Sequence, residues 1–304
     1  MKNTPSLPDD KMLDWSHDDI ERRIGFRGAK YTDVNTWFAL TLSLVLFGLL
    51  FAGLRFLPPE AHKYRAVSLV MDRGWTPWAM TFLAILALVI LFVKWRKLAF
   101  QARAFEIEII PSANDFALTS ETAQDAIRRL RSFVDNPAHF VLFNRIERAL
   151  QNLRNVGNVS DVSEMLRAQA ENDESHVDSS YGLLSGIVWA IPILGFIGTV
   201  IGLSGAIGKF GSVLSAESDL GSLKEGLAPV TSNLGIAFDT TFLALVLAMV
   251  IQMLVTLLRK REDLFLDACR DYAHENVTSR LRLAPRPEGD APRPIDKCGD
   301  DLAP

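Results

Sequence analysis

The sequence contains few of the residues that catalysis, metal binding and disulfide bonding require. Among its 304 residues there are two cysteines and five histidines. Cys269 and Cys298 lack the spacing of metal ligands and are interpreted as reduced cytoplasmic thiols. The histidines are scattered, in no pattern that indicates catalysis. We therefore expect no enzyme activity, no metal and no cofactor, and the net charge of −4 gives no reason to expect nucleic-acid binding.

Charge is also missing from two long stretches in the C-terminal half. Residues 179–208 contain no charged side chain, and residues 227–258 contain one, Asp239. Each stretch is longer than the roughly 20 apolar residues that span a bilayer. Because only residues 209–226 separate them, they are predicted to form an antiparallel hairpin of two membrane helices with a short periplasmic loop.

Two further apolar blocks, residues 37–57 and 75–95, are predicted to be membrane helices separated by a periplasmic loop at 58–74. Tryptophans lie at the ends of these blocks, as in interfacial aromatic belts; they are Trp37, Trp75, Trp78 and Trp95. The fold predicted is an all-α membrane protein with four transmembrane helices. Its long third and fourth helices extend into a cytoplasmic helical domain.

Basic residues near the segment ends predict the orientation, because cytoplasmic loops carry an excess of lysine and arginine. They lie before the first span, after the second and after the fourth, for example at Arg27, Lys97 and Lys260. Both termini are therefore predicted to be cytoplasmic. The remaining segments are assigned as an N-terminal arm (1–36), the helical domain (96–178), a cytoplasmic helix (259–283) and a disordered, proline-rich tail (284–304).

Within the helical domain, residues 119–134 are predicted to form a helix opened by a threonine or serine cap. This helix carries a basic cluster, Arg128, Arg129 and Arg131. The cluster is interpreted either as a docking site for a cytoplasmic partner or as a solvated helix face.

Small residues recur at helical spacing in both C-terminal stretches. The first stretch carries Gly195, Gly198, Gly202 and Gly205, and the second carries Ala237, Thr241, Ala244 and Ala248. Lipid supplies no hydrophobic drive between helices, so small residues that allow close backbone approach indicate helix packing. Pro192 removes a backbone donor and is expected to kink its helix.

Asp239 is unusual, because a carboxylate at membrane depth costs on the order of 3 kcal/mol and faces protein or water rather than lipid. At about 100° per residue, Asp239 and Thr241 point roughly 200° apart. We therefore expect Thr241 to face a lumen and Asp239 to lie against a neighbouring helix or a subunit seam. The alternative is a purely structural aspartate that is buried and either protonated or locally paired.

The motifs IPILGFIGTVIGL (191–203) and LGIAFDTTFLALVLAM (234–249) resemble the last two membrane helices of the MotA/TolQ/ExbB proton channel family. Pro192 matches the proline early in the penultimate helix, Thr199 the threonine of the TolQ/ExbB-type LGxxGT motif, and Thr241 the threonine of the last helix. The ExbB-type glutamate falls here on Ile236, and Asp239 has no assigned counterpart.

The resemblance implies a proton-conducting subunit of the bacterial inner membrane that forms a homopentamer around a dimer of a single-span MotB/TolR/ExbD-like partner. An aspartate of that partner would carry the proton. The residues implied to line the ion path or face the partner are Thr199, Thr241, Thr240, Pro192, Ala237 and Ala244. A sodium-driven stator and a non-conducting membrane scaffold remain alternatives. A small-molecule transporter is less favoured, because no internal inverted repeat is visible.

Overall fold

The computed structural model describes residues 30–56, 73–107, 118–153, 159–215 and 220–282, together with residue 109 and isolated residues within 13–28 and 67–70. Over this part of the chain the regular structure is helical, and the extended pairing is limited to two isolated bridges, Leu13 with Val134 and Leu118 with Leu281. The predicted all-α fold is confirmed.

The helices follow one another along the described residues. They are α2 (Ile20–Arg23), α3 (Thr36–Arg55), α5 (Thr76–Ala102), α6 (Ser120–Phe133), α7 (Val141–Asn152), α8 (Val159–Ser180), α9 (Gly182–Ser215) and α10 (Leu220–Ala273). Short 3-10 segments occupy Arg103–Glu106 and Pro137–His139, and a π-helical turn, η4, occupies His274–Thr278. Four helical stretches, within α3, α5, α8–α9 and α10, are long and apolar enough to cross a membrane.

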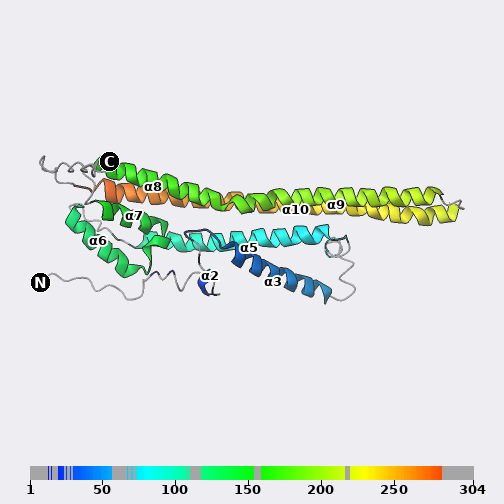
Figure 1. The fold of residues 1–304 in the computed structure, drawn as a ribbon, viewed down its shortest axis with the longest axis horizontal. Coiled ribbons are helices and arrows are strands. Elements are labelled where there is room, and N and C mark those ends of the chain that lie inside the picture. Colours follow the sequence, from blue (N-terminus) through cyan, green and yellow to red (C-terminus); the bar gives the residue numbers. More distant parts are fainter. Residues whose placement is uncertain are drawn as a thin grey trace, which may run out of the picture.

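Helices α9 and α10 form a long antiparallel pair around which the other helices are arranged (Figure 1). Helix α5 lies alongside this pair, and α3 packs on α5 through two aromatic contacts, Phe47 with Phe82 and Phe51 with Trp78, at centroid distances of 5.7 and 4.9 Å. The α9–α10 pair continues past the Thr76 end of α5 (Figure 1).

Two polar contacts bound the apolar part of α5, from Thr76 to Lys94. Lys94 lies beside Glu262, and at the other end Thr76 lies against Gly198, where an added Cβ would be 3.1 Å from its hydroxyl oxygen. At 1.5 Å per residue, Thr76 and Lys94 are about 27 Å apart along the helix, close to the thickness of a bilayer core. The part of α9 and α10 alongside α5 therefore matches one membrane crossing.

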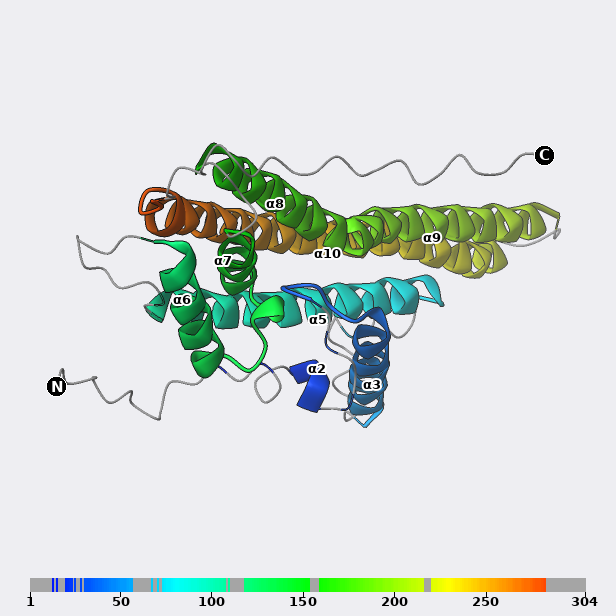
Figure 2. The same cartoon turned by 60° about the vertical axis from the view of Figure 1, so that its left-hand side comes forward.

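Helices α6, α7 and α8 gather with the C-terminal part of α10 at the Lys94 end; we call this group the end domain (Figure 2). As the sequence predicts, α6 begins after a threonine cap, because Thr119 and Thr122 form a reciprocal capping box. Phe140 and Phe143 of the core are fully buried, with ring centroids 5.2 Å apart. Leu118 and Arg280 join the two chain segments through a backbone hydrogen bond of 2.9 Å.

The predicted basic cluster lies on the surface of α6. Arg128 forms an ion pair of 2.5 Å with Asp125 of its own helix, and Arg131 forms one of 2.7 Å with Glu147 of α7. Arg129 is also exposed. Docking of a partner at this cluster stays a prediction.

Candidate functional site

Four glycines of α9 bring its backbone against α10. A Cβ added to Gly195 would overlap Ala244 Cβ, one added to Gly198 would lie 2.6 Å from Thr240 Oγ1, and one added to Gly202 would lie 2.9 Å from Ala237 Cβ. At Gly205 the nearest atom is Asn233 Oδ1, at 3.2 Å. We call this contact surface, from Gly195 to Gly205 on α9 and from Asn233 to Ala244 on α10, the seam. Glycine allows the two helices to meet this closely.

The alanines of α10 fill the other side of the seam. Ala237, Thr240 and Ala244 are all buried within the single chain. The structure thus places these three predicted partner-facing groups in the packing between helices of one chain rather than on an outward surface. The small-residue spacing of α10 identifies its contact face, and the neighbour on that face is α9.

Threonine hydroxyls border the seam in two different ways. Thr199 donates to Phe196 O at 2.6 Å, and Thr240 donates to Ile236 O and Ala237 O at 3.0 Å, so both bond within their own helices. Thr241 also lies 3.4 Å from a carbonyl of its own helix, Ala237 O, but its hydroxyl reaches across to α9 as well, where it lies 3.3 Å from Gly195 O. Thr199 and Thr241 are half-buried, and a donating hydroxyl keeps lone pairs that can still accept.

Pro192 lies one turn before Gly195 inside α9, whose helix continues without interruption from Gly182 to Ser215. The side chain is half-buried. Proline has no N–H, so one carbonyl of the preceding turn is left without its usual helical donor. This carbonyl lies between the Tyr181 end of α9 and the seam.

Asp239 forms an ion pair with Arg73, which lies just before α5; Arg73 Nη2 and Asp239 Oδ2 are 2.9 Å apart. Gly74, with φ of 91°, turns the chain between Arg73 and α5. The two side chains are 26 % and 12 % exposed, and the pair lies at the level of Thr76. The sequence predicted that Asp239 lies against a neighbouring helix or a subunit seam, but it did not identify Arg73 as the partner. The signal that could have identified it is the position of Arg73, a cation directly before the second predicted span.

Further along α5, at Lys94, four chain segments meet at the buried carboxylate of Glu262. Tyr181 donates to Glu262 Oε2 at 2.5 Å, Lys94 Nζ lies 3.5 Å from the same oxygen, and Thr32 donates to Oε1. Lys94 also lies 4.4 Å from the centroid of the Tyr181 ring. We call Thr32, Lys94, Tyr181 and Glu262 the Glu262 clamp. It fixes α5, α9 and α10 relative to one another, and sequence reasoning missed it.

A second buried network ties α7 to α8 in the end domain. Arg145 Nε lies 2.7 Å from Asp173 Oδ2, and Tyr31 donates to Asp173 Oδ1 at 3.1 Å. Asn144 donates to the Tyr31 hydroxyl at 2.7 Å. Burial, together with the nearby Asp173 charge, raises the pKa of Tyr31 to about 12, so its phenol stays protonated and keeps donating. Burial likewise raises the pKa of the Cys269 thiol to about 12.

Comparison with known proteins identifies the part of the chain that carries this site. Residues 138–270 match the model of the MotA/TolQ/ExbB proton channel family. The matched segment contains α7, α8, α9 and α10 up to Arg270, and hence the whole seam. Neither the curated proteins nor the solved structures give a match to the chain.

Proposed function

Because residues 138–270 belong to the MotA/TolQ/ExbB proton channel family, we propose that this membrane protein is the proton-conducting subunit of an ion-driven motor. In this proposal it couples the proton-motive force to movement of a single-span MotB/TolR/ExbD-like partner. It lies in the bacterial inner membrane with both termini and the end domain in the cytoplasm, as a homopentamer around a dimer of the partner.

The observation that carries the proposal is the position of Thr241. Its half-buried hydroxyl lies between two closely packed, nearly uncharged spans and reaches Gly195 O across the seam. Thr199 lies one turn from Gly195 on the same face of α9. Hydroxyls suit a site where an acid alternately gains and loses a proton, because they donate to the carboxylate and accept from the acid.

The acid itself has to come from another protein. Within the described part of α9 and α10 alongside α5, the charged group near the seam is Asp239, and it is engaged by Arg73. A partner aspartate opposite Thr199 and Thr241 would supply the titrating group. Each proton that crosses 100 mV releases roughly 2.3 kcal/mol, so several transits could drive stepwise movement of the partner.

The outer faces of α9 and α10 support assembly in lipid or with further copies. Large apolar side chains project from both helices, among them Trp189, Phe196, Phe238, Phe242 and Met249. A ring of such subunits would bury part of this surface between neighbours and leave the rest to lipid.

A non-conducting scaffold is the competing function, and one observation favours it. The hydroxyls of Thr199 and Thr240 are already bonded to carbonyls of their own helices, as is common for threonine in membrane helices, and the Thr241 hydroxyl also lies 3.4 Å from a carbonyl of α10. A scaffold of this kind tolerates apolar replacement at Thr199 and Thr241, whereas a conducting seam does not.

The test compares Thr241→Val, which keeps the shape and removes the hydroxyl, with Thr241→Ser, which keeps the hydroxyl. Proton flux is measured in inverted vesicles from cells that co-express the chain with a single-span MotB/TolR/ExbD-like protein. We expect Thr241→Val to lower the flux about tenfold, equivalent to about 1.4 kcal/mol, while Thr241→Ser conducts. Thr231→Val is the matched control, because Thr231 is an exposed threonine of α10 that bonds within its own helix.

Wild-type flux in Thr241→Val would contradict the proposal and favour the scaffold. The sodium alternative is distinguished in the same vesicles by replacing the proton gradient with a sodium gradient. Flux that follows sodium and ignores the pH difference would identify a sodium-driven member of the family.

A further inference from the structure

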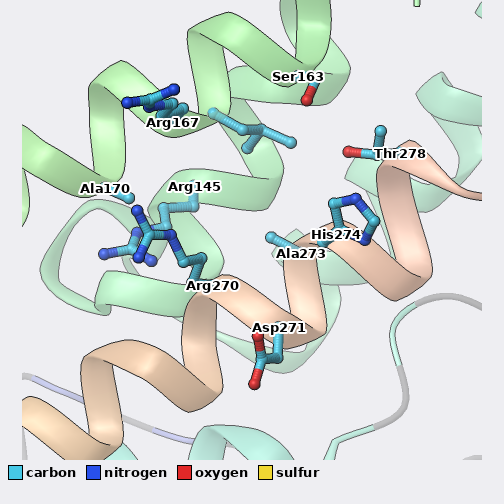
Figure 3. A pocket seen from close by; sticks show the side chains of 10 residues that line it. Arg145, Ser163, Arg167, Ala170, Arg270, Asp271, Ala273, His274 and Thr278 are labelled. Atoms are coloured by element: carbon cyan, nitrogen blue, oxygen red, sulfur yellow. The ribbon is translucent and has the colours of Figure 1, made fainter.

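The end domain contains a cavity of about 350 Å³ between α8 and the C-terminal end of α10 (Figure 3). Its wall combines basic groups and hydroxyls from three helices and the η4 turn. The polar residues that matter here are Arg145, Arg167, Arg270, His274, Ser163 and Thr278. The volume is at the lower end of the range for small-molecule sites.

Arg145 is a buried cation with an unused donor. The residue is 1 % exposed, and its Nε is engaged by Asp173 Oδ2 at 2.7 Å. Its Nη1 is buried and has no hydrogen-bond partner. A buried, charged N–H without an acceptor is destabilising and is rare in proteins unless water or a ligand meets it.

Arg270 adds a second guanidinium at the same end of the cavity (Figure 3). Within the described residues it forms no ion pair, unlike Arg167, which pairs with Glu171 on the surface of α8. Arg145 and Arg270 also both line an adjoining cavity of about 240 Å³. Two guanidinium groups at one end of a cavity, one of them without an ion pair in the described part of the chain, favour a bound anion.

Asp173 pairs with Arg145 through Nε, and the other acidic residues that the structure describes around this end form no ion pair with either arginine. Asp271 lines the larger cavity, but its carboxylate points away from the two arginines (Figure 3). Glu174, Asp263 and Asp267 line the adjoining cavity, and among the described groups none of the three forms an ion pair with Arg145 or Arg270. An anion in the larger cavity thus meets guanidinium groups first.

We propose that this cavity binds a small phosphate-bearing anion. The phosphate group lies at the end formed by Arg145 and Arg270, where planar guanidinium groups can donate pairs of hydrogen bonds to its oxygens. The rest of the ligand extends toward His274, Ser163 and Thr278, which offer an imidazole and two hydroxyls. Helix α8 leads into α9, and α10 continues into the membrane, so the ligand would bridge both arms of the hairpin at their base.

The site is tested by titration calorimetry on the purified full-length chain in detergent. The probes are AMP, inorganic phosphate and adenosine, which separate the phosphate from the organic part of the ligand. We expect saturable binding of the two phosphate-bearing probes and none of adenosine. Tighter binding of AMP than of phosphate identifies a phosphate ester as the ligand class, and equal affinities identify free phosphate.

Arg270→Gln should weaken binding of the phosphate-bearing probes at least tenfold. Arg128→Gln is the matched control, because Arg128 is an exposed arginine of α6 outside the cavity, and it should bind like the wild type. Arg270 is exposed, so its replacement should leave the melting temperature without ligand unchanged. Absence of saturable binding by both phosphate-bearing probes, or equal binding by Arg270→Gln and the wild type, would overturn the proposal. The result is independent of proton conduction.

Discussion

The membrane half and the end-domain half of the α8–α9–α10 assembly are held together by opposite means. In the membrane half, the segment from Gly195 to Gly205 packs closely on α10, and most of the residues at this contact are glycine, alanine and threonine. The other half has an apolar core that includes Phe140 and Phe143, and it adds buried charges, with Glu262 joined to Lys94 and Arg145 joined to Asp173. Lipid offers no hydrophobic drive, so close contact has to hold the first half, whereas buried ion pairs hold a defined geometry in the second.

The difference matters for the proposed function. The seam provides hydroxyls beside a narrow contact. The charged groups lie off this contact, with Asp239 turned to Arg73, or beyond one end of it, at the Glu262 clamp. A carboxylate of the partner that moved along the seam could form a hydrogen bond with Thr241, whose hydroxyl reaches across the seam to Gly195 O. The buried charges would keep the hairpin base fixed while this happens.

The largest effect is expected where a buried ion pair of the end domain is broken. Asp173→Ala leaves the Arg145 charge buried without its carboxylate and removes the acceptor of the Tyr31 phenol. We expect the free energy of unfolding to fall by about 3–5 kcal/mol. Chemical unfolding in detergent, followed by circular dichroism, measures it.

The control for this prediction is Glu171→Ala on the same helix. Glu171 pairs with Arg167 on the surface, where the two side chains are 58 % and 73 % exposed. Its loss should change the stability by less than about 0.5 kcal/mol. Equal losses in the two variants would show that burial does not distinguish the pairs.

In the membrane half, Gly195→Ala should destabilise through overpacking alone. The added Cβ overlaps Ala244 Cβ, so α9 and α10 have to separate. We expect a loss of about 1–3 kcal/mol, measured by the same unfolding experiment. Gly186→Ala, in the same helix with no atom within 4 Å of the new Cβ, should be neutral or slightly stabilising, because alanine favours the helix. A similar loss in both variants would argue against a closely packed seam.

The parts of the fold that sequence reasoning predicted depend on local spacing. The four apolar blocks and the Thr119 cap are properties of neighbouring residues, and so they could be recognised directly. Ala237 and Ala244 show the limit of this reasoning, since periodicity identifies a contact face but not whether the neighbour on it is the same chain or another protein.

The polar contacts could not be predicted because they join residues far apart in the sequence. Glu262 meets Tyr181 across 81 positions and Lys94 across 168. Each of these charges lies near a span end, where a solvated or interfacial position is the ordinary interpretation. Only the packing of α5 against α9 and α10 turns them into a buried cluster.

The smallest effect is expected at the Arg73–Asp239 ion pair beside the seam. Because both side chains retain some exposure, we expect Arg73→Gln to cost about 1 kcal/mol or less. A double-mutant cycle with Asp239→Asn isolates the pair, since the double variant should regain most of what either single change loses. Asp178→Asn, which breaks the surface pair with Arg259, is the control and should have no measurable effect. Only a desolvated ion pair gives a coupling energy well above about 2 kcal/mol. A value that large would therefore mean that an ion pair stabilises the membrane half as much as ion pairs stabilise the end domain.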